Sequence, residues 1–254
     1  MVIFYYDKTF EGLLTAVFDA YDRKTFPDQL LAEGDPGPIF AESFYTVITQ
    51  KEKSDRVWKG LEKKMGKELR NMVVYTWLSE EPGCDQLLFR YLRKIFDSPH
   101  TILTDFADGD ILQVKNLARK VNRDKRYIIQ FVRFQKAADD IFFAPVSPRY
   151  NSLPLSLYYF KDRFADQQWV IYDVKRKYGY YYDKKKITEI SILENDHILS
   201  GKLDEHMMAE DEKTFQELWK NYFKALTIKE RLNFKLQRQN MPRRFWKFLT
   251  EKQS

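Results

Sequence analysis

The chain has 254 residues, 44% hydrophobic and 31% charged, a balance that indicates a folded protein and excludes a disordered one. Lys and Arg (43) outnumber Asp and Glu (37), so the net charge of +6 permits an anionic partner without requiring one. The single cysteine, Cys84, excludes an intramolecular disulfide, and no apolar run approaches the roughly 20 residues that span a bilayer.

The first half of the chain is predicted to be mainly helical. Residues 2–6 predict a short strand, and Asp7 or Thr9 can cap the helix that follows. Residues 33–38 predict a surface loop from their Pro and Gly content. Apolar positions at helical spacing mark that first helix and four more, in the order Phe10–Tyr21, Val57–Met65, Leu69–Trp77, Leu87–Phe96 and Ile111 to about Arg126.

The second half changes to strand patterns. Residues 131–134 and 141–146 flank a polar turn and predict a hairpin. A helix over 155–164 then leads to three strands, expected at 169–174, 178–182 and 187–192. These elements predict an antiparallel meander with one helical crossover.

The C-terminal third is predicted to be helical again. Thr214 with Glu217, and Thr227 with Glu230, have the spacing of a capping box. Pro242 suits the first turn of a last helix. The whole chain, 1–254, therefore predicts a single α+β domain: mainly helical over 1–126, sheet-rich over 127–192 and helical over 210–254, with the antiparallel sheet packed against the N- and C-terminal helices.

Motifs for known chemistry are missing from the sequence. It has no Gly-rich phosphate loop, no Gly-x-Ser-x-Gly elbow and no His-Glu-x-x-His helix. His197 and His206 lie in an acidic segment, but their spacing matches no metal template, so a solvated acidic face is expected, with no metal and no cofactor. Cys84 follows a Pro-Gly turn without a nearby base and is expected to be an ordinary thiol.

Two carboxylates are candidates for catalysis. Asp173 ends a predicted strand beside a basic turn and could act as a general base or a metal ligand, although an ion-paired structural role is the favoured interpretation. Asp7 follows the first strand, where a helix-capping role is the simpler interpretation.

Basic and aromatic residues give the stronger indication. Lys175, Arg176 and Lys177 form a predicted tight turn, and Arg243 and Arg244 begin the last helix, where an external anion would relieve their repulsion by the helix dipole. The other predicted nucleic-acid contacts are Arg149, Arg163, Trp169 and Trp246. The alternatives are scattered solubilising charge for the cations and core packing for the two tryptophans.

Several segments resemble a bacterial family of DNA-repair or DNA-metabolism proteins of unknown activity. The resemblance rests on residues 7–21, 131–134, 163–171, 218–223 and 241–249, which occur in the family's order. It implies a radical-SAM partner, because such proteins are typically encoded beside a radical-SAM protein proposed to modify or repair DNA. It also implies kinship with a domain fused to uracil-DNA glycosylase-like proteins. The fused form carries a His where this chain has Arg126-Tyr127, so no catalytic role for that His carries over.

Three hypotheses follow. The first is a cytoplasmic DNA-binding accessory of a radical-SAM enzyme, without a membrane partner, that binds single-stranded or damaged DNA. The second is a glycosylase-like hydrolase that acts on a nucleobase. The third is a non-catalytic scaffold whose basic surface binds an acidic protein.

Overall fold

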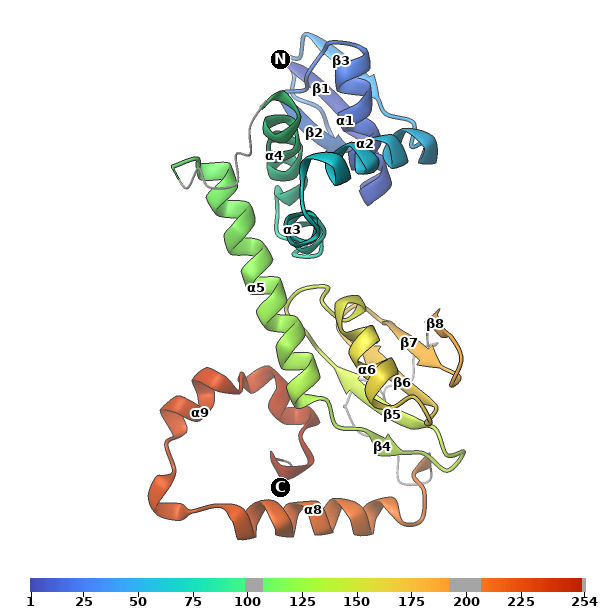
Figure 1. Ribbon diagram of the computed structural model, residues 1–254, viewed down its shortest axis with the longest axis vertical. Coiled ribbons are helices and arrows are strands. Elements are labelled where there is room, and N and C mark those ends of the chain that lie inside the picture. Colours follow the sequence, from blue (N-terminus) through green and yellow to red (C-terminus); the bar gives the residue numbers. More distant parts are fainter. Residues whose placement is uncertain (99–106, 192–206, 253–254) are drawn as a thin grey trace. The chain divides into compact units, whose positions relative to one another are not determined.

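The computed structural model describes residues 1–98, 107–191 and 207–252, and the chain divides into two compact units, Met1–Asn122 and Arg123–Ser254 (Figure 1). Helices and two sheets occur together, so the α+β class is confirmed. The single domain over 1–254 stays a prediction, because this division does not test it.

The first unit contains a three-stranded parallel sheet in the order β2-β1-β3. β1 (Val2–Tyr6) was predicted and is the central strand, whereas β2 (Gln29–Ala32) and β3 (Ser43–Thr46) were not predicted. Each of the two missed strands has four residues, and most side chains of β3 are exposed, so neither carries a clear apolar pattern. A parallel pair needs a crossover, which α1 (Phe10–Asp22) supplies between β1 and β2.

Helices and the parallel sheet of this unit share one core. After α1 come α2 (Lys51–Lys64), α3 (Lys67–Trp77) and α4 (Cys84–Asp97), and α5 (Gly109–Phe131) begins here and ends in the second unit. Buried residues of β1, α1 and α4 pack in this core, among them Phe4, Leu13, Val17, Leu88 and Leu92. The N-terminal helices therefore cover their own parallel sheet, which corrects the prediction that they cover an antiparallel one.

The second unit contains a five-stranded mixed sheet in the order β4-β5-β6-β7-β8. Its strands are β4 (Gln135–Lys136), β5 (Phe142–Val146), β6 (Trp169–Asp173), β7 (Tyr178–Tyr182) and β8 (Ile187–Ile190). β5 and β6 pair in parallel, connected through a 3-10 turn (Pro154–Ser156) and α6 (Leu157–Arg163), and the other neighbours are antiparallel. The meander and its helical crossover are confirmed, but a purely antiparallel sheet is wrong, since the crossover makes its two strands parallel.

Two strands of the mixed sheet, β5 and β6, are buried on both faces. Ala144, Trp169 and Ile171 lie in one cluster with Phe160 of α6 and Ile128 of α5. On the other face, Phe143, Tyr172 and Val174 pack with Phe248 from the C-terminal segment. Successive residues of these strands, which point to opposite faces, are consequently mostly apolar, as expected where a sheet is covered on both sides.

The strand predicted at 131–134 is wrong. Phe131 is the last residue of α5, and the first strand of the hairpin is β4, which begins at Gln135. The rings of Tyr127 and Phe131, one helical turn apart, contact the buried ring of Phe245 at centroid distances of 6.0 and 5.6 Å. Because Phe245 is more than a hundred residues away in sequence, local alternation could not reveal that this segment packs as a helix.

The C-terminal elements differ most from the prediction. They are α8 (Glu212–Leu226), a 3-10 turn (Lys229–Arg231), α9 (Phe234–Asn240), η4 (Arg243–Phe248) and η5 (Thr250–Lys252). The segment after Pro242 is a six-residue 3-10 helix and not the predicted α-helix. α8 forms as predicted, but most of its apolar side chains are exposed and do not cover the sheet.

Gly179 lies in β7 where no side chain fits. A Cβ atom there would lie 2.5 Å from the carbonyl oxygen of Ile171 and 2.9 Å from the Cα of Tyr172. We expect Gly179→Ala to lower the free energy of unfolding by about 1–3 kcal/mol, because backbone atoms of β6 must move. Urea unfolding checks this, with Gly66→Ala, where a Cβ meets nothing within 4 Å, as the control; equal losses in both variants would contradict it.

Candidate nucleic-acid interface

Loop 148–152, which connects β5 to the 3-10 turn before α6, is where the predicted basic clusters meet. From the β6–β7 turn, the Arg176 guanidinium donates to the carbonyl oxygens of Pro148 and Arg149 at 3.3 and 3.2 Å. The Lys175 ammonium also donates to the carbonyl oxygen of Arg149, at 3.3 Å. The turn at 175–177 is therefore fixed against this loop.

The second cluster reaches the same loop through Asp124 of α5. One carboxylate oxygen of Asp124 accepts from the backbone N–H of Tyr150 at 3.0 Å and from the Ser152 hydroxyl at 3.2 Å. Its other oxygen pairs with the guanidinium of Arg244. The turn at 175–177 and Arg244, about 70 residues apart in sequence, are thus both connected to loop 148–152.

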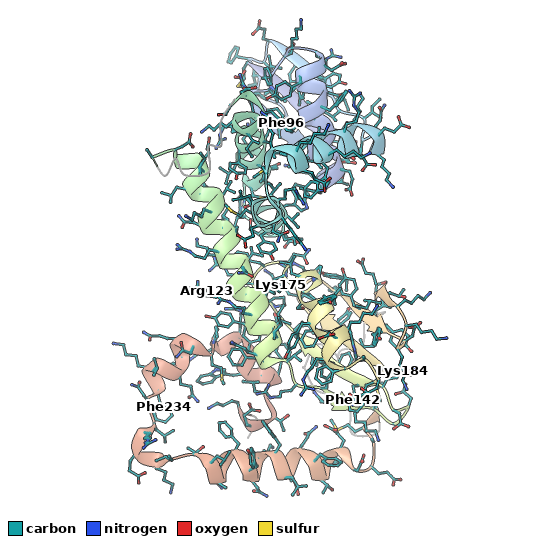
Figure 2. All side chains as sticks on the ribbon, viewed as in Figure 1. Phe96, Arg123, Phe142, Lys175, Lys184 and Phe234 are labelled. Carbon is teal, nitrogen blue, oxygen red and sulfur yellow. The ribbon has the colours of Figure 1, made fainter. Side chains whose placement is uncertain are left out.

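Two of the converging cations are engaged by buried carboxylates. The Arg176 guanidinium lies 3.0 Å from Asp173, whose side chain is 0% exposed, and Arg244 pairs with Asp124, which is 2% exposed. The anion that relieves Arg244 is thus internal, where an external one was expected. Lys175, Lys177, Arg149 and Arg243 are exposed, and Figure 2 labels Lys175 on this part of the unit.

The sequence analysis missed the exposed cations of α5, two of which lie beside Asp124. Arg123 and Arg126 flank Asp124 in the helix, and Arg123 is labelled in Figure 2. The available signal was a run of six basic residues and one acidic residue over 115–126. It was overlooked because the run was interpreted only through its apolar stripe.

The aromatic candidates separate into two environments. Trp169 is 0% exposed between Phe160 and Tyr182, so it fills the core and cannot stack on a base. Trp246 is half-buried, and its indole N–H donates to the carbonyl oxygen of Met241 at 3.0 Å. The Arg243 guanidinium lies 5.8 Å from the Trp246 ring. Of the two predicted tryptophans, Trp246 is therefore the one that lies beside an exposed cation, Arg243.

Tyrosines of β7 adjoin the loop as well. The Tyr178 hydroxyl donates to the side-chain oxygen of Asn151 at 2.5 Å, and the Tyr180 hydroxyl donates to Glu189 at 3.1 Å. Burial raises the pKa of both phenols, so they stay neutral at physiological pH. Both rings are half-buried. They add neutral, partly accessible aromatic surface next to the basic residues.

Arg163 does not take part in this convergence. It is the last residue of α6, and its guanidinium lies 5.6 Å from the ring of Phe164. Its side chain is exposed and contacts the ring of Phe164, not loop 148–152.

Asp173 has the environment of a structural carboxylate. Its oxygens accept from the backbone N–H groups of Lys175 and Arg176 at 2.9 and 3.2 Å. Burial raises the pKa of Asp173, although the Arg176 guanidinium and the two N–H groups oppose this shift. Because the side chain has no exposed surface, no substrate can reach it in this conformation.

Asp7 organises the start of α1. Its carboxylate accepts from the backbone N–H and hydroxyl of Thr9 at 3.0 and 2.7 Å and from the Thr49 hydroxyl at 2.9 Å. Burial favours the neutral acid, but these hydrogen bonds outweigh it and hold the pKa of Asp7 below its usual range. The cap itself is Thr9, whose hydroxyl accepts from the Gly12 N–H. A carboxylate with a lowered pKa is a weak general base.

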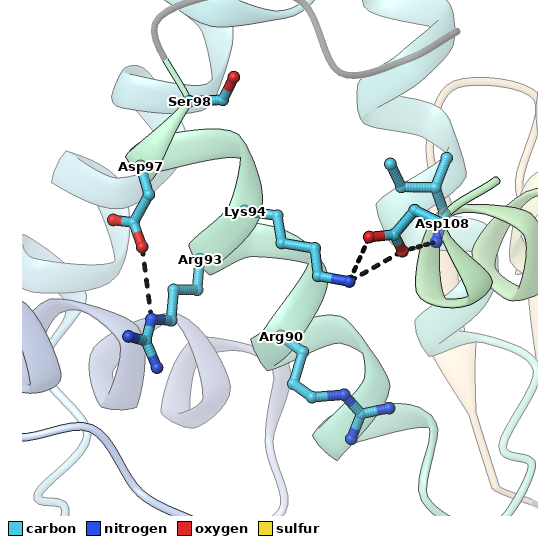
Figure 3. Close-up of a pocket in the computed structure, with 7 residues that line it drawn as sticks. Arg90, Arg93, Lys94, Asp97, Ser98 and Asp108 are labelled. Atoms are coloured by element: carbon cyan, nitrogen blue, oxygen red, sulfur yellow. Dashed lines mark hydrogen bonds and ion pairs between the residues drawn. The ribbon is translucent and has the colours of Figure 1, made fainter. Parts of the chain in front are cut away.

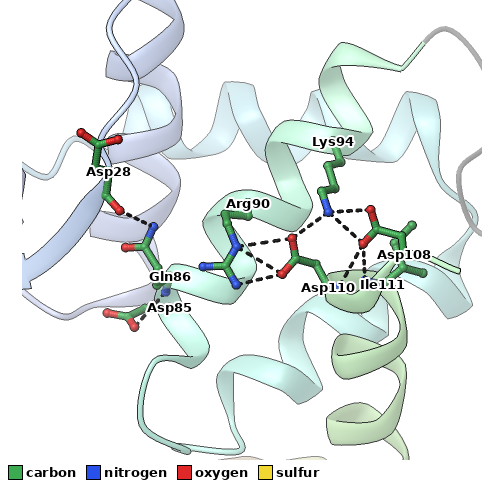
Figure 4. Close-up of polar contacts among 8 residues, drawn as sticks. All are labelled: Asp28, Asp85, Gln86, Arg90, Lys94, Asp108, Asp110 and Ile111. Atoms are coloured by element: carbon green, nitrogen blue, oxygen red, sulfur yellow. Dashed lines mark hydrogen bonds and ion pairs between the residues drawn. The ribbon is translucent and has the colours of Figure 1, made fainter. Parts of the chain in front are cut away.

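A cavity of about 550 Å³ lies in the first unit and is lined mainly by charged residues (Figure 3). The Lys94 ammonium lies 2.6 Å from Asp108 and 2.7 Å from Asp110, and Arg90 lies 2.8 Å from Asp110 (Figure 4). Arg93 pairs with Asp97 at 3.3 Å. Since each of these cations faces a carboxylate, the cavity wall is close to neutral and lacks the excess positive charge of a phosphate site.

The remaining candidates are a thiol and the three imidazoles. Burial, followed by the charge of Asp85, raises the pKa of Cys84, so the thiol stays protonated and unreactive, as expected. His100, His197 and His206 lie outside the described residues.

Among the described residues, no helix has the length and apolarity to cross a membrane. The cytoplasmic location stays a prediction.

Comparison with known protein families matches residues 82–251, roughly two thirds of the chain, to a domain of unknown function, DUF4130. The chain belongs to the DUF4130 family. The match includes every residue that meets at loop 148–152, whereas Asp7 lies outside it. No curated protein and no solved structure matches the chain.

Asp85, within the DUF4130 match, makes the stability of the first unit pH-dependent. Burial favours its neutral form, but hydrogen bonds from Lys8 and Tyr6 outweigh it and lower the pKa of Asp85. A lowered folded-state pKa gives stability that is present above the unfolded pKa of about 3.9 and is lost as the pH falls. We expect Asp85→Asn to cost about 2 kcal/mol at pH 7 and less at pH 3.

Urea unfolding between pH 3 and pH 7 measures this difference. Asp55→Asn is the matched control, because Asp55 is an exposed carboxylate of α2. A cost for Asp85→Asn that is the same at both pH values would contradict the assignment.

Proposed function

We propose that this chain binds DNA through the surface around loop 148–152 and acts in DNA repair or DNA metabolism as an accessory to a radical-SAM protein. The observation that carries the proposal is the convergence of two sequence-distant basic segments on one loop. Lys175, Lys177, Arg149 and Arg243 are exposed there and would contact phosphates. Trp246, Tyr178 and Tyr180 offer aromatic surface beside them for an unpaired base.

The two arginines that pair with buried carboxylates are proposed to position the exposed cations and not to contact DNA. Arg176 and Arg244 fix the turn and the C-terminal segment to the loop, so the exposed cations are positioned before the ligand arrives. Such preorganisation lowers the entropy cost of binding. Arg176 and Arg244 were predicted to contact phosphates, and in this proposal they position the exposed cations instead.

Binding is preferred to base chemistry for a specific reason. A nucleobase hydrolase needs a carboxylate or an activated water that faces the extruded base. Asp173 has no exposed surface, and hydrogen bonds from Thr9 and Thr49 lower the pKa of Asp7 and so weaken it as a base. The accessory function requires neither carboxylate to react.

Fluorescence anisotropy with a labelled single-stranded oligonucleotide, its duplex and an abasic duplex tests the proposal. We expect the logarithm of the affinity to fall linearly with the logarithm of the salt concentration, with a slope set by the number of phosphate contacts. An affinity in low salt no better than that of an unrelated protein of the same charge would contradict it. A stable complex with the radical-SAM protein, together with no DNA binding by either protein or by the complex, would favour the scaffold hypothesis instead.

A further inference from the structure

α8 presents an apolar stripe to solvent, which we define as Phe215, Leu218, Trp219, Tyr222 and Leu226. The residues follow the spacing i, i+3, i+4, i+7 and i+11, so they lie on one side of the helix. Their exposed fractions range from 38% for Trp219 to 62% for Leu226. Figure 1 shows α8 as a peripheral element of its unit.

The exposed area of the stripe is comparable to the largest apolar patch of a typical monomer, which is often a functional surface. Side chains of this size that are about half exposed leave on the order of 100 Å² each in water, so the α8 stripe exposes about 500 Å². The largest apolar patch of a typical monomer is about 300–600 Å². The segment that follows adds four exposed apolar residues, Ile228, Leu232, Phe234 and Leu236. At the same value of about 100 Å² for each side chain, the nine expose about 900 Å², compared with the roughly 800 Å² that each partner buries in a standard interface.

Polar contacts hold α8 in place. At its start, the Glu212 carboxylate accepts from the backbone N–H of Lys136 in β4 at 3.0 Å. Near its middle, the Trp219 indole N–H donates to Glu251 at 2.9 Å, and Glu251 pairs with Arg133 at 2.7 Å. These contacts engage one side of the stripe at Trp219 and leave Leu218 and Tyr222, each 57% exposed, open to solvent.

The charges of α8 indicate what the stripe fits. At about 100° per residue, the three lysines of the helix, Lys213, Lys220 and Lys224, lie toward the side opposite the stripe. The residues that border the stripe are mostly uncharged, namely Thr214, Gln216, Asn221 and Ala225. A nucleic acid or an acidic protein would require cations beside the stripe for recognition. The same stripe on a second copy of the chain requires no cations there. Two copies can meet along it with their lysines on the outer faces.

We propose that the α8 stripe packs against the same stripe of a second copy of this chain. An apolar strip with an uncharged border is complementary to itself, which is the requirement for a twofold-symmetric interface. The stripe by itself exposes less than the roughly 800 Å² that each partner buries in a standard interface, and the exposed apolar residues that follow α8 are needed to reach that area.

Sedimentation equilibrium of the full chain tests the pairing. We expect a particle of twice the 30.6 kDa chain mass. Leu218→Glu with Tyr222→Glu should weaken the dimer by roughly tenfold or more, because both residues lie at the centre of the stripe. The control is Ile39→Glu with Phe40→Glu, which makes the same chemical change at positions that are 92% and 91% exposed; this variant should remain dimeric.

A crosslinking variant keeps the test decisive if the acidic variant unfolds. In a Cys84→Ser background, Leu218→Cys should form a disulfide-linked dimer on oxidation, and Ile39→Cys should not. A monomeric wild-type chain, a dimer that the double substitution leaves intact, or equal crosslinking at both cysteines would overturn the proposal. Association of the monomer with phospholipid vesicles in place of self-association would also overturn it.

Discussion

Reversing two exposed charges, with Lys175→Glu and Lys177→Glu, should weaken binding of single-stranded DNA by roughly tenfold or more at low salt. Both side chains project from the turn that contacts loop 148–152. The salt slope should fall by about 0.7 for each lost phosphate contact, hence by about 1.4 for the pair. Fluorescence anisotropy over a series of salt concentrations measures the affinity and the slope together.

The matched control is Lys184→Glu with Lys185→Glu. These lysines are exposed in the next turn, at the opposite end of β7, so the net charge changes equally while loop 148–152 is untouched (Figure 2). An equal loss of affinity in the two variants would mean that total charge and not this surface governs binding. An unchanged affinity in the 175/177 variant would remove the proposed interface.

Arg176→Ala should lower the free energy of unfolding by about 3–5 kcal/mol, because it leaves the Asp173 carboxylate buried without its counter-charge. The Asp173 side chain is 0% exposed, and the guanidinium also supports the carbonyl oxygens of Pro148 and Arg149. Urea unfolding at pH 7 measures the loss. Lys175→Ala, at the exposed neighbouring position, should cost less than about 1 kcal/mol.

The pH dependence of this loss distinguishes lost charge compensation from lost packing. Burial raises the pKa of Asp173 in the folded chain above its value in the unfolded chain. The folded chain therefore binds the proton of Asp173 more tightly, and this contribution to the free energy of unfolding is lost as the pH rises. The deficit of Arg176→Ala should therefore shrink toward acid pH. Adding Asp173→Asn should restore part of the stability at pH 7. A deficit that is independent of pH and is not relieved by the second substitution would show that packing alone is lost.

Local pattern was sufficient for elements whose apolar residues meet a core nearby. The strand at 2–6, the stripe of α1 and the three strands of the meander all have side chains that alternate or repeat at the period of the structure they form. The tight turn at 175–177 followed from its position between two aromatic strands. Membership of an uncharacterised family could also be inferred from the sequence, since the matched segments extend over most of the chain.

Tertiary contacts decided the remaining features. Phe131 stays helical because Phe245 packs on it, and a parallel sheet in the first unit depends on two strands too short to carry a period. The sequence supplied the cations of the candidate interface but not their partners. Which arginines are held by a buried carboxylate depends on Asp124 and Asp173, and burial of these carboxylates is a property of the folded core.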